Sequence, residues 1–143
     1  MLFLGKYKHS IDTKNRLTLP TKFVDKLSSE VYISKGFDGC LELRSEKEFK
    51  DYSSAILSHS NTKQNVRQVQ RVFLSLTTKV GIDSVKRILL SSNLLEKANI
   101  TKDVYVIGVG NKIEIWDMSS FDAYEKEAES HYESAAESIS DGN

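Results

Sequence analysis

The sequence predicts a mixed β fold with short helices, formed by two internal repeats and followed by a C-terminal helix. Residues 11–19 recur 71 positions later as residues 82–90, with Ile, Asp and Arg kept and apolar residues alternating after the Arg. Two further blocks recur in the same order, residues 31–33 as 104–106 and residues 41–43 as 113–115. A repeat of this kind implies two small units that share one core.

The residue pattern predicts four short strands in each copy, because short apolar runs alternate with turn-forming residues. In the first copy the strands cover residues 5–10, 17–19, 31–34 and 40–44. In the second copy they cover residues 77–81, 88–90, 104–108 and 112–116. The first two strands of each copy flank a tight turn, so we expect each pair to form a hairpin-like element.

Helices are expected after the second strand of each copy, between the copies and at the C-terminus. Pro20 suits a first helical turn, which does not need its missing N–H, with Phe23, Val24 and Leu27 on one face; Ser91, Ser92 or Asn93 can cap the equivalent helix. A linker helix is predicted by the helical spacing of Val66, Val69, Val72, Phe73 and Leu76. We expect the polar end of the chain to be disordered. The expected organisation is a first unit at 1–58, the linker helix at 59–76, a second unit at 77–118, and a C-terminal helix with an acidic tail at 119–143.

The zero net charge of the 143-residue chain conceals a strong asymmetry. Residues 1–90 carry 16 Lys and Arg against 9 Asp and Glu, whereas residues 91–143 carry 4 against 11. A basic body with an acidic C-terminal segment suits a protein that meets phosphate with one surface. The single Cys40 excludes an intrachain disulfide framework. No stretch approaches the roughly 20 apolar residues of a membrane span, so we expect a soluble, cytoplasmic protein with no membrane partner. Contact of its basic surface with DNA would make it nucleoid-associated.

The repeated Asp-x-x-x-Arg turns are the candidate site. An Asp at the head of a tight turn can accept hydrogen bonds from backbone N–H groups and fix the loop. The Arg then projects, and its planar guanidinium fits phosphate or the guanine edge in a bidentate way. We expect both turns to present their basic side chains on one face. The candidate DNA-binding residues are Asp12, Lys14, Asn15, Arg16, Asp83, Lys86 and Arg87.

The competing interpretation is that the two Asp–Arg pairs are weak surface ion pairs. Most polar positions around the turns differ between the copies, whereas the Asp–Arg pair is kept in both. This retention favours a function for the pair over surface decoration.

These residues resemble the MraZ family of bacterial transcriptional regulators over essentially the whole chain. The matching motifs are Gly5-Lys6-Tyr7-Lys8-His9, the Asp12-to-Arg16 turn followed by Leu19-Pro20, and the Asp83-to-Arg87 turn with Ile113-Glu114-Ile115-Trp116-Asp117. The resemblance implies two AbrB-like units interleaved into a double-ψ or swapped-hairpin β-barrel. It also implies a ring-shaped homo-oligomer, octamer-like or larger, that binds direct repeats in double-stranded DNA upstream of the division and cell-wall gene cluster.

The sequence departs from the family pattern at both turns. The family usually has Gly just before the Arg, where Asn15 and Lys86 stand here, and Ser91 replaces the usual proline after the second turn. Asn tolerates a positive φ better than Lys does, so we expect the second turn to differ in shape or to be strained. We therefore expect Arg16 to contribute more to DNA binding than Arg87.

Other classes of function fit the sequence less well. His9, His59 and His131 are scattered, no glycine-rich phosphate loop is present, and Glu42 and Glu114 are interpreted as outward-facing strand residues. We expect no enzyme activity, no cofactor and no metal. An antitoxin-like module that holds a partner protein with its C-terminal tail is the main alternative. Single-strand or RNA binding would need aromatic residues among the basic ones, and only Tyr7 qualifies.

Overall fold

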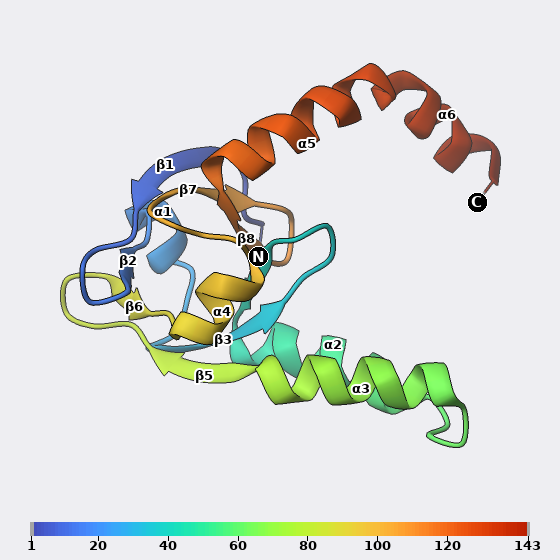
Figure 1. Ribbon diagram of the computed structural model, residues 1–143, viewed down its shortest axis with the longest axis horizontal. Helices are drawn as coiled ribbons and strands as arrows, with labels where there is room; N and C mark the ends of the chain where they lie inside the picture. Colours follow the sequence, from blue (N-terminus) through green and yellow to red (C-terminus); the bar gives the residue numbers. More distant parts are fainter. Residues whose placement is uncertain (1, 143) are drawn as a thin grey trace.

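The computed structural model describes residues 2–142 as a β-rich body with two helical arms (Figure 1). The first copy contributes strands β1 Lys6–Ser10, β2 Arg16–Thr18, β3 Glu30–Lys35 and β4 Leu41–Arg44. The second contributes β5 Thr78–Gly81, β6 Arg87–Leu89, β7 Asp103–Gly108 and β8 Ile113–Asp117. The body also contains two short helices, α1 Thr21–Val24 and α4 Ser92–Lys97. The first arm consists of α2 Glu46–Leu57 and α3 Gln64–Leu76. The second arm consists of α5 Met118–Ser130 and α6 Tyr132–Gly142. Met1, the first residue of the expected first unit, and Asn143, the last residue of the expected tail, lie outside the described residues.

The strands of the two copies are interleaved. Six strands form one antiparallel sheet in the order β1-β7-β8-β4-β3-β5, and β2 pairs with β6 as a two-stranded ribbon. The order reads the same from both ends when each strand is exchanged for its repeat equivalent, so a pseudo-twofold axis relates the copies. In the ribbon, Leu17 faces its equivalent Ile88, and in the sheet Glu42 faces Glu114. This is the swapped-hairpin arrangement of two AbrB-like units.

The expected pairing of strands within each hairpin is wrong. Strand β1 pairs with β7 of the second copy, and β5 pairs with β3 of the first, so each copy lends its first strand to the other. Across the first turn the flanking segments share one isolated bridge, between Ile11 and Leu17. The exchange buries the apolar faces of both copies in one core, which neither small unit could form alone. Within residues 2–142 the sheet ends at β1 and β5, with no ladder joining these two strands into a closed barrel.

One apolar core lies between the ribbon, the sheet and the short helices. Its fully buried members come from both copies in equivalent pairs and include Leu17, Leu19, Leu41, Leu43, Ile88, Leu90, Ile113 and Ile115. Full burial of one such side chain stabilises the fold by about 1.5–3 kcal/mol. The core therefore fixes the ribbon that carries the two turns. None of the helices within residues 2–142 has both the length and the apolar character needed to cross a membrane.

The predicted strands agree with the structure to within one residue, whereas three helical predictions differ. The linker helix, expected over residues 59–76, begins only at Gln64, and residues 59–63 form a turn. Ser91 caps α4 by accepting a hydrogen bond from the backbone N–H of Leu94 at 3.2 Å, as predicted. Helix α2 is not in the prediction, although Ser45 followed by Glu48 is a capping signature, and Ser45 accepts from the Glu48 N–H at 3.4 Å. The expected disorder of the C-terminal end is also wrong, because α6 extends to Gly142.

The expectation that Glu42 faces solvent is wrong as well. Glu42 is only 1% exposed, and its carboxylate accepts hydrogen bonds from Arg44 Nη1 and Lys112 Nζ, both at 2.7 Å. The Arg44 guanidinium in turn stacks on the Tyr52 ring of α2, 3.6 Å from its centre. Glu114 is partly buried and accepts from Trp116 Nε1 at 2.9 Å. Helix α2 covers this face of the sheet, and the two cations compensate the buried carboxylate.

Candidate nucleic-acid interface

The first turn is held by the side chain of Asp12. Its Oδ1 accepts from the backbone N–H groups of Lys14 and Arg16, both at 2.9 Å. Its Oδ2 accepts from Arg16 Nε at 2.9 Å. One carboxylate thus closes the loop and orients the guanidinium that follows it. The Arg16 side chain remains 32% exposed.

The second turn repeats this arrangement. Asp83 Oδ1 accepts from the backbone N–H groups of Val85 and Arg87 at 3.0 and 2.8 Å, and Asp83 Oδ2 accepts from Arg87 Nε at 2.9 Å. The Arg87 side chain is 30% exposed. Of the two expected alternatives, a different shape or strain, the first is excluded, because the second turn keeps the shape of the first. The expected strain is present instead, because Lys86 has a φ of +68°, close to the +61° of Asn15.

Each turn is anchored to the other copy of the repeat. The carbonyl oxygens of Asn15 and Lys86 accept from the backbone N–H groups of Leu90 and Leu19 respectively, both at 2.9 Å. The side chains of Asn15 and Lys86 donate to hydroxyl groups at the starts of the opposite helices. These contacts are Asn15 Nδ2 to Ser92 Oγ at 3.2 Å and Lys86 Nζ to Thr21 Oγ1 at 3.1 Å. The left-handed backbone at both positions turns the carbonyl toward the opposite copy.

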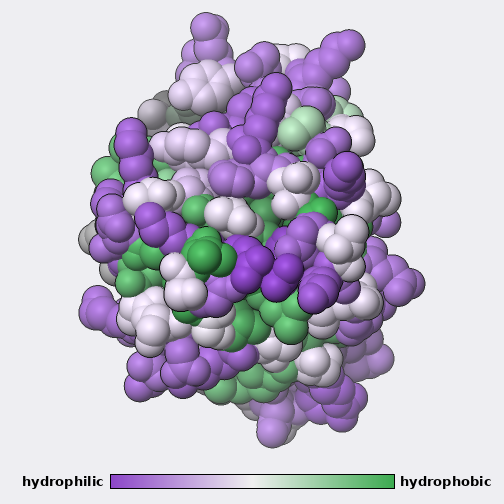
Figure 2. Space-filling view, turned by 90° about the vertical axis from the view of Figure 1, so that its left-hand side faces the viewer, coloured by the Kyte–Doolittle hydropathy of each residue, from purple (hydrophilic) through white to green (hydrophobic). Residues whose placement is uncertain are grey.

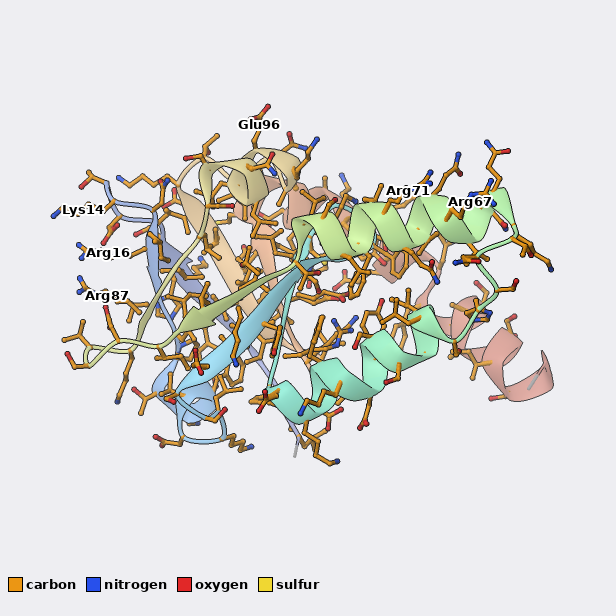
Figure 3. The ribbon with its side chains drawn as sticks, turned by 90° about the horizontal axis from the view of Figure 1, so that it is seen from below. Lys14, Arg16, Arg67, Arg71, Arg87 and Glu96 are labelled. Atoms are coloured by element: carbon orange, nitrogen blue, oxygen red, sulfur yellow. The ribbon has the colours of Figure 1, made fainter. Side chains whose placement is uncertain are left out.

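The two turns lie at the same end of the molecule, far from the tips of the arms (Figures 1 and 3). Lys14, Arg16 and Arg87 project together from this end, whereas Arg67 and Arg71 extend from α3 (Figure 3). In the ribbon Arg16 pairs with Leu89 and Thr18 pairs with Arg87. Figure 2 looks onto this end of the molecule, where hydrophilic side chains surround a few apolar ones. The structure therefore brings three of the sequence-predicted basic residues, Lys14, Arg16 and Arg87, together on one face.

The two aspartates carry charge that the turns stabilise. The backbone N–H of Arg16, and then its guanidinium, hold the pKa of Asp12 below its ordinary value. The pKa of Asp83 is lowered in the same way by the backbone N–H and guanidinium of Arg87. The ionised carboxylates therefore keep each arginine Nε occupied. Within residues 2–142 the terminal nitrogens of both guanidinium groups make no hydrogen bond, and these are the donors that fit phosphate or guanine.

The structure adds residues to the site that the sequence reasoning missed. Thr21 and Ser92 anchor the turns, and their only sequence signal is their equivalent position in the repeat. Leu89 is 58% exposed beside Arg16, and Val85 is 55% exposed at the tip of the second turn, where the first turn has Lys14. The two ends of the ribbon therefore share a backbone and an arginine but differ in their neighbouring side chains.

One other cluster contains groups that bind metals elsewhere in proteins. Ligand atoms of Cys40, Glu42 and Glu114 lie within 4.8 Å of one another. Glu42 is already paired with two cations, and burial raises the pKa of the Cys40 thiol to about 12. The cluster is therefore an ion-paired network, separate from the two turns.

The fold and the turns define an internally duplicated AbrB-like protein that presents two equivalent arginine-bearing turns on one face. Comparison with known proteins agrees with the duplication. The family model for the MraZ protein, described as antitoxin-like, matches residues 2–72 and again residues 73–141. Each copy of the repeat is therefore one MraZ unit.

Relatives of similar length carry the same resemblance. The transcriptional regulator MraZ of Mesoplasma florum is 46% identical over 143 residues, covering 99% of this chain and 98% of the relative. The one from Mycoplasmoides gallisepticum is 39% identical over 140 residues, covering 98% and 99%. The one from Acetivibrio thermocellus is 36% identical over 138 residues, covering 96% of each. The chain belongs to the MraZ family.

Proposed function

We propose that this protein is a sequence-specific DNA-binding transcriptional regulator whose contact surface is the pair of Asp-x-x-x-Arg turns. The observation that carries the proposal is the duplicated geometry in which an aspartate holds each arginine Nε and leaves the terminal nitrogens available. An ordered guanidinium loses less freedom when it binds than a mobile one does. The naming of the relatives as transcriptional regulators supports the same function.

The charge of the contact surface indicates how strongly one subunit would bind. Lys14, Arg16, Lys86 and Arg87 offer four cations, while Asp12 and Asp83 offset two of them. Small electrostatic sites bind non-specific DNA with a Kd of about 10⁻⁴ to 10⁻⁶ M at physiological salt. Useful affinity therefore requires several subunits on one DNA molecule, because linked sites gain about 10²- to 10⁴-fold. We infer a ring-shaped homo-oligomer, associated with the nucleoid, that binds direct repeats upstream of the division and cell-wall gene cluster.

Fluorescence anisotropy on duplexes with one or two repeats tests this function. The duplexes come from the DNA upstream of the protein's own gene. We expect tight binding to two repeats and a large loss with one. The logarithm of the association constant should fall with the logarithm of salt concentration, with a slope of about −2 to −4 per engaged subunit. Equal affinity for one and two repeats would contradict the role of assembly.

Arginine variants test the turns themselves. Arg16→Ala and Arg87→Ala should each weaken binding, while Lys126→Ala, which removes the same charge from helix α5 of the second arm, is the matched control and should not. We expect the greater loss from Arg16→Ala, because the first turn also carries the exposed Lys14 and the second carries Val85. Equal losses of DNA affinity in the two variants would contradict the expectation that the first copy contributes more to binding. Binding that survives both substitutions would remove the proposed contact surface.

An antitoxin-like interaction module is the second candidate, and one observation favours it. Helix α6 exposes Tyr132 and Ile139 at 73% and 68%, which is a surface suited to another protein chain. Affinity capture from a lysate separates the two functions. A single stoichiometric protein partner recovered in place of DNA would favour the module over the regulator.

A further inference from the structure

Helix α6 has an amphipathic surface that no part of residues 2–142 covers. Tyr132, Ala135, Ala136 and Ile139 fall on one side of the helix at helical spacing, and every residue from 131 to 140 is exposed. An isolated helix of 11 residues is marginal in water, because helices shorter than about 12–15 residues depend on packing. The apolar side of α6 is therefore expected to pack against another surface.

The repeat indicates what kind of surface that is. The offset of 71 or 72 that relates the copies makes α5 the equivalent of α2, and makes α6 the equivalent of the first half of α3. In the first copy, α3 folds back beside α2, and Phe73 stacks on Phe49 with ring centres 5.8 Å apart. In the second copy α6 continues outward from α5 (Figure 1). Helix α6 thus lacks the helical neighbour that its equivalent has.

The first arm carries an unfilled apolar groove of about 260 Å³. It lies between α2, α3 and the turn that joins β3 to β4. Its apolar lining is formed by Phe37, Tyr52, Ile56, Val69, Val72 and Phe73. Phe37, Val69 and Val72 are 72%, 52% and 50% exposed, so the groove is open along one side of the helical pair. A third helix laid there would convert the pair into a three-helix bundle.

The charges around the two surfaces are opposite. Between residues 118 and 140 the second arm has six carboxylates and one lysine. Helix α3 has Arg67 and Arg71 and no acidic residue, and Lys35 lines the groove itself. Opposite charges on two partners speed their association and fix their orientation. The acidic helix therefore matches the groove in charge as well as in apolar character.

We propose that α6 of one subunit packs into the α2–α3 groove of a second copy of this chain. The apolar side of α6, which we call the stripe, and the groove are different surfaces of the same molecule, so the contact is head-to-tail. Each subunit then offers one helix and one groove, and repetition of such a contact closes into a ring when the rotation permits. This inference names the contact behind the ring of the proposed function. It leaves the two turns, at the other end of the molecule, free for DNA.

Disulfide trapping between two different chains tests the contact. One chain carries Val72→Cys and the other Ile139→Cys, and the native Cys40 is buried. We expect rapid formation of a mixed disulfide-linked dimer after mild oxidation. Ser134→Cys, on the side of α6 away from the stripe, is the matched control and should cross-link several-fold less with Val72→Cys. Equal cross-linking would overturn the inference, as would a disulfide that forms only within a chain carrying both Cys substitutions.

Mass measurement by light scattering gives the second test. Ile139→Lys should lower the assembled mass toward the 16.2 kDa of one chain, whereas Ser134→Lys, with the same change of charge, should not. Because Ile139 is exposed, the melting temperature of the body should not change. An unchanged mass for Ile139→Lys would overturn the inference. If the disulfide forms in a protein that binds no DNA, the contact is supported and the proposed function is refuted. If the protein binds two-repeat DNA but the disulfide does not form, the proposed function is supported and the contact is refuted.

Discussion

Replacing Asp12 by Asn separates two explanations of how the first turn would bind DNA. The substitution removes a negative charge from a face that meets phosphate, so charge alone predicts tighter binding. The geometry predicts weaker binding. The Asn carbonyl oxygen can still accept the backbone N–H groups of Lys14 and Arg16, but its amide group would face Arg16 Nε, donor against donor.

The size of the effect follows from the freedom that Arg16 gains. A guanidinium that loses its Nε acceptor samples more rotamers before it binds. Ordering one long side chain at an interface costs about 0.5–1.5 kcal/mol, which corresponds to a ~2- to ~12-fold increase in Kd. A DNA molecule that engages two subunits would lose roughly the square of this factor, about 5- to 150-fold.

The assay is anisotropy on a two-repeat duplex at one fixed salt concentration. Asp25→Asn is the matched control, because Asp25 is an exposed carboxylate at the end of α1 and the change in charge is the same. We expect Asp12→Asn to weaken binding and Asp25→Asn to leave it unchanged or slightly tighter. If both variants bind equally well or more tightly, the orienting role of Asp12 is refuted and charge alone governs the site.

Acid removes the same negative charge, which gives the prediction a pH dependence. The pKa of Asp12 lies below the ordinary 3.8, first because of the backbone N–H of Arg16. A lowered pKa in the folded state stabilises the fold above the unfolded pKa, and that stability is lost as the pH falls through the folded-state pKa. The turn should therefore remain ordered at about pH 5 and loosen only below 3.8. Carbon NMR titration of Asp12 measures this, and a midpoint at or above 3.8 contradicts it; Arg16→Ala should keep part of the shift, because its backbone N–H remains.

Three further predictions concern stability and reactivity. Lys86→Gly should raise the free energy of unfolding, measured in urea, by about 1 kcal/mol. Left-handed backbone costs a non-glycine residue about 1–2 kcal/mol, and the greater conformational entropy of glycine in the unfolded chain cancels part of the gain. Lys14→Gly is the control and should bring no such gain, because Lys14 has no positive φ. Glu42→Gln should destabilise the fold by about 3–5 kcal/mol, because it leaves the buried Arg44 without a carboxylate partner and Lys112 with Glu114 alone. Its control, the exposed Glu46→Gln, should change the unfolding free energy little, and equal effects would show that the buried network is unimportant. Cys40 should resist alkylation at pH 8 in the folded protein and react quickly in denaturant, because burial raises its pKa to about 12; equal rates would show that the thiol is accessible.

The sequence predicts the turns well because their chemistry is local. Asp12 reaches partners two and four residues away, so their type and spacing are enough to predict the loop. The anchors of the turns could not be predicted in this way. Asn15 meets Ser92 across 77 residues, and Lys86 meets Thr21 across 65. Such contacts depend on the exchange of strands between the copies, which periodicity does not reveal.

The same limit explains the error at Glu42. Alternation along a strand assigns residues to two faces of a sheet, and it does assign Glu42 and Leu43 to opposite faces. It does not reveal what covers each face. Here α2 lies over the polar face, and Arg44 stacks on Tyr52 from that helix. Burial of a carboxylate therefore follows from a helix that the sequence reasoning did not include.

The differences between the two copies bear on the kind of DNA that the proposed regulator would read. A protein with true twofold symmetry matches palindromic sites, because both halves present the same side chains. In this chain the axis is only approximate. One end of the ribbon has Lys14 and Leu89 beside its arginine, and the other has Val85 and Thr18. Two unequal ends give each subunit a direction on DNA, and a head-to-tail assembly of directed subunits matches repeats that all run the same way. If inverted repeats of the same spacing bound as tightly as direct repeats, the asymmetry of the ribbon would have no role in recognition.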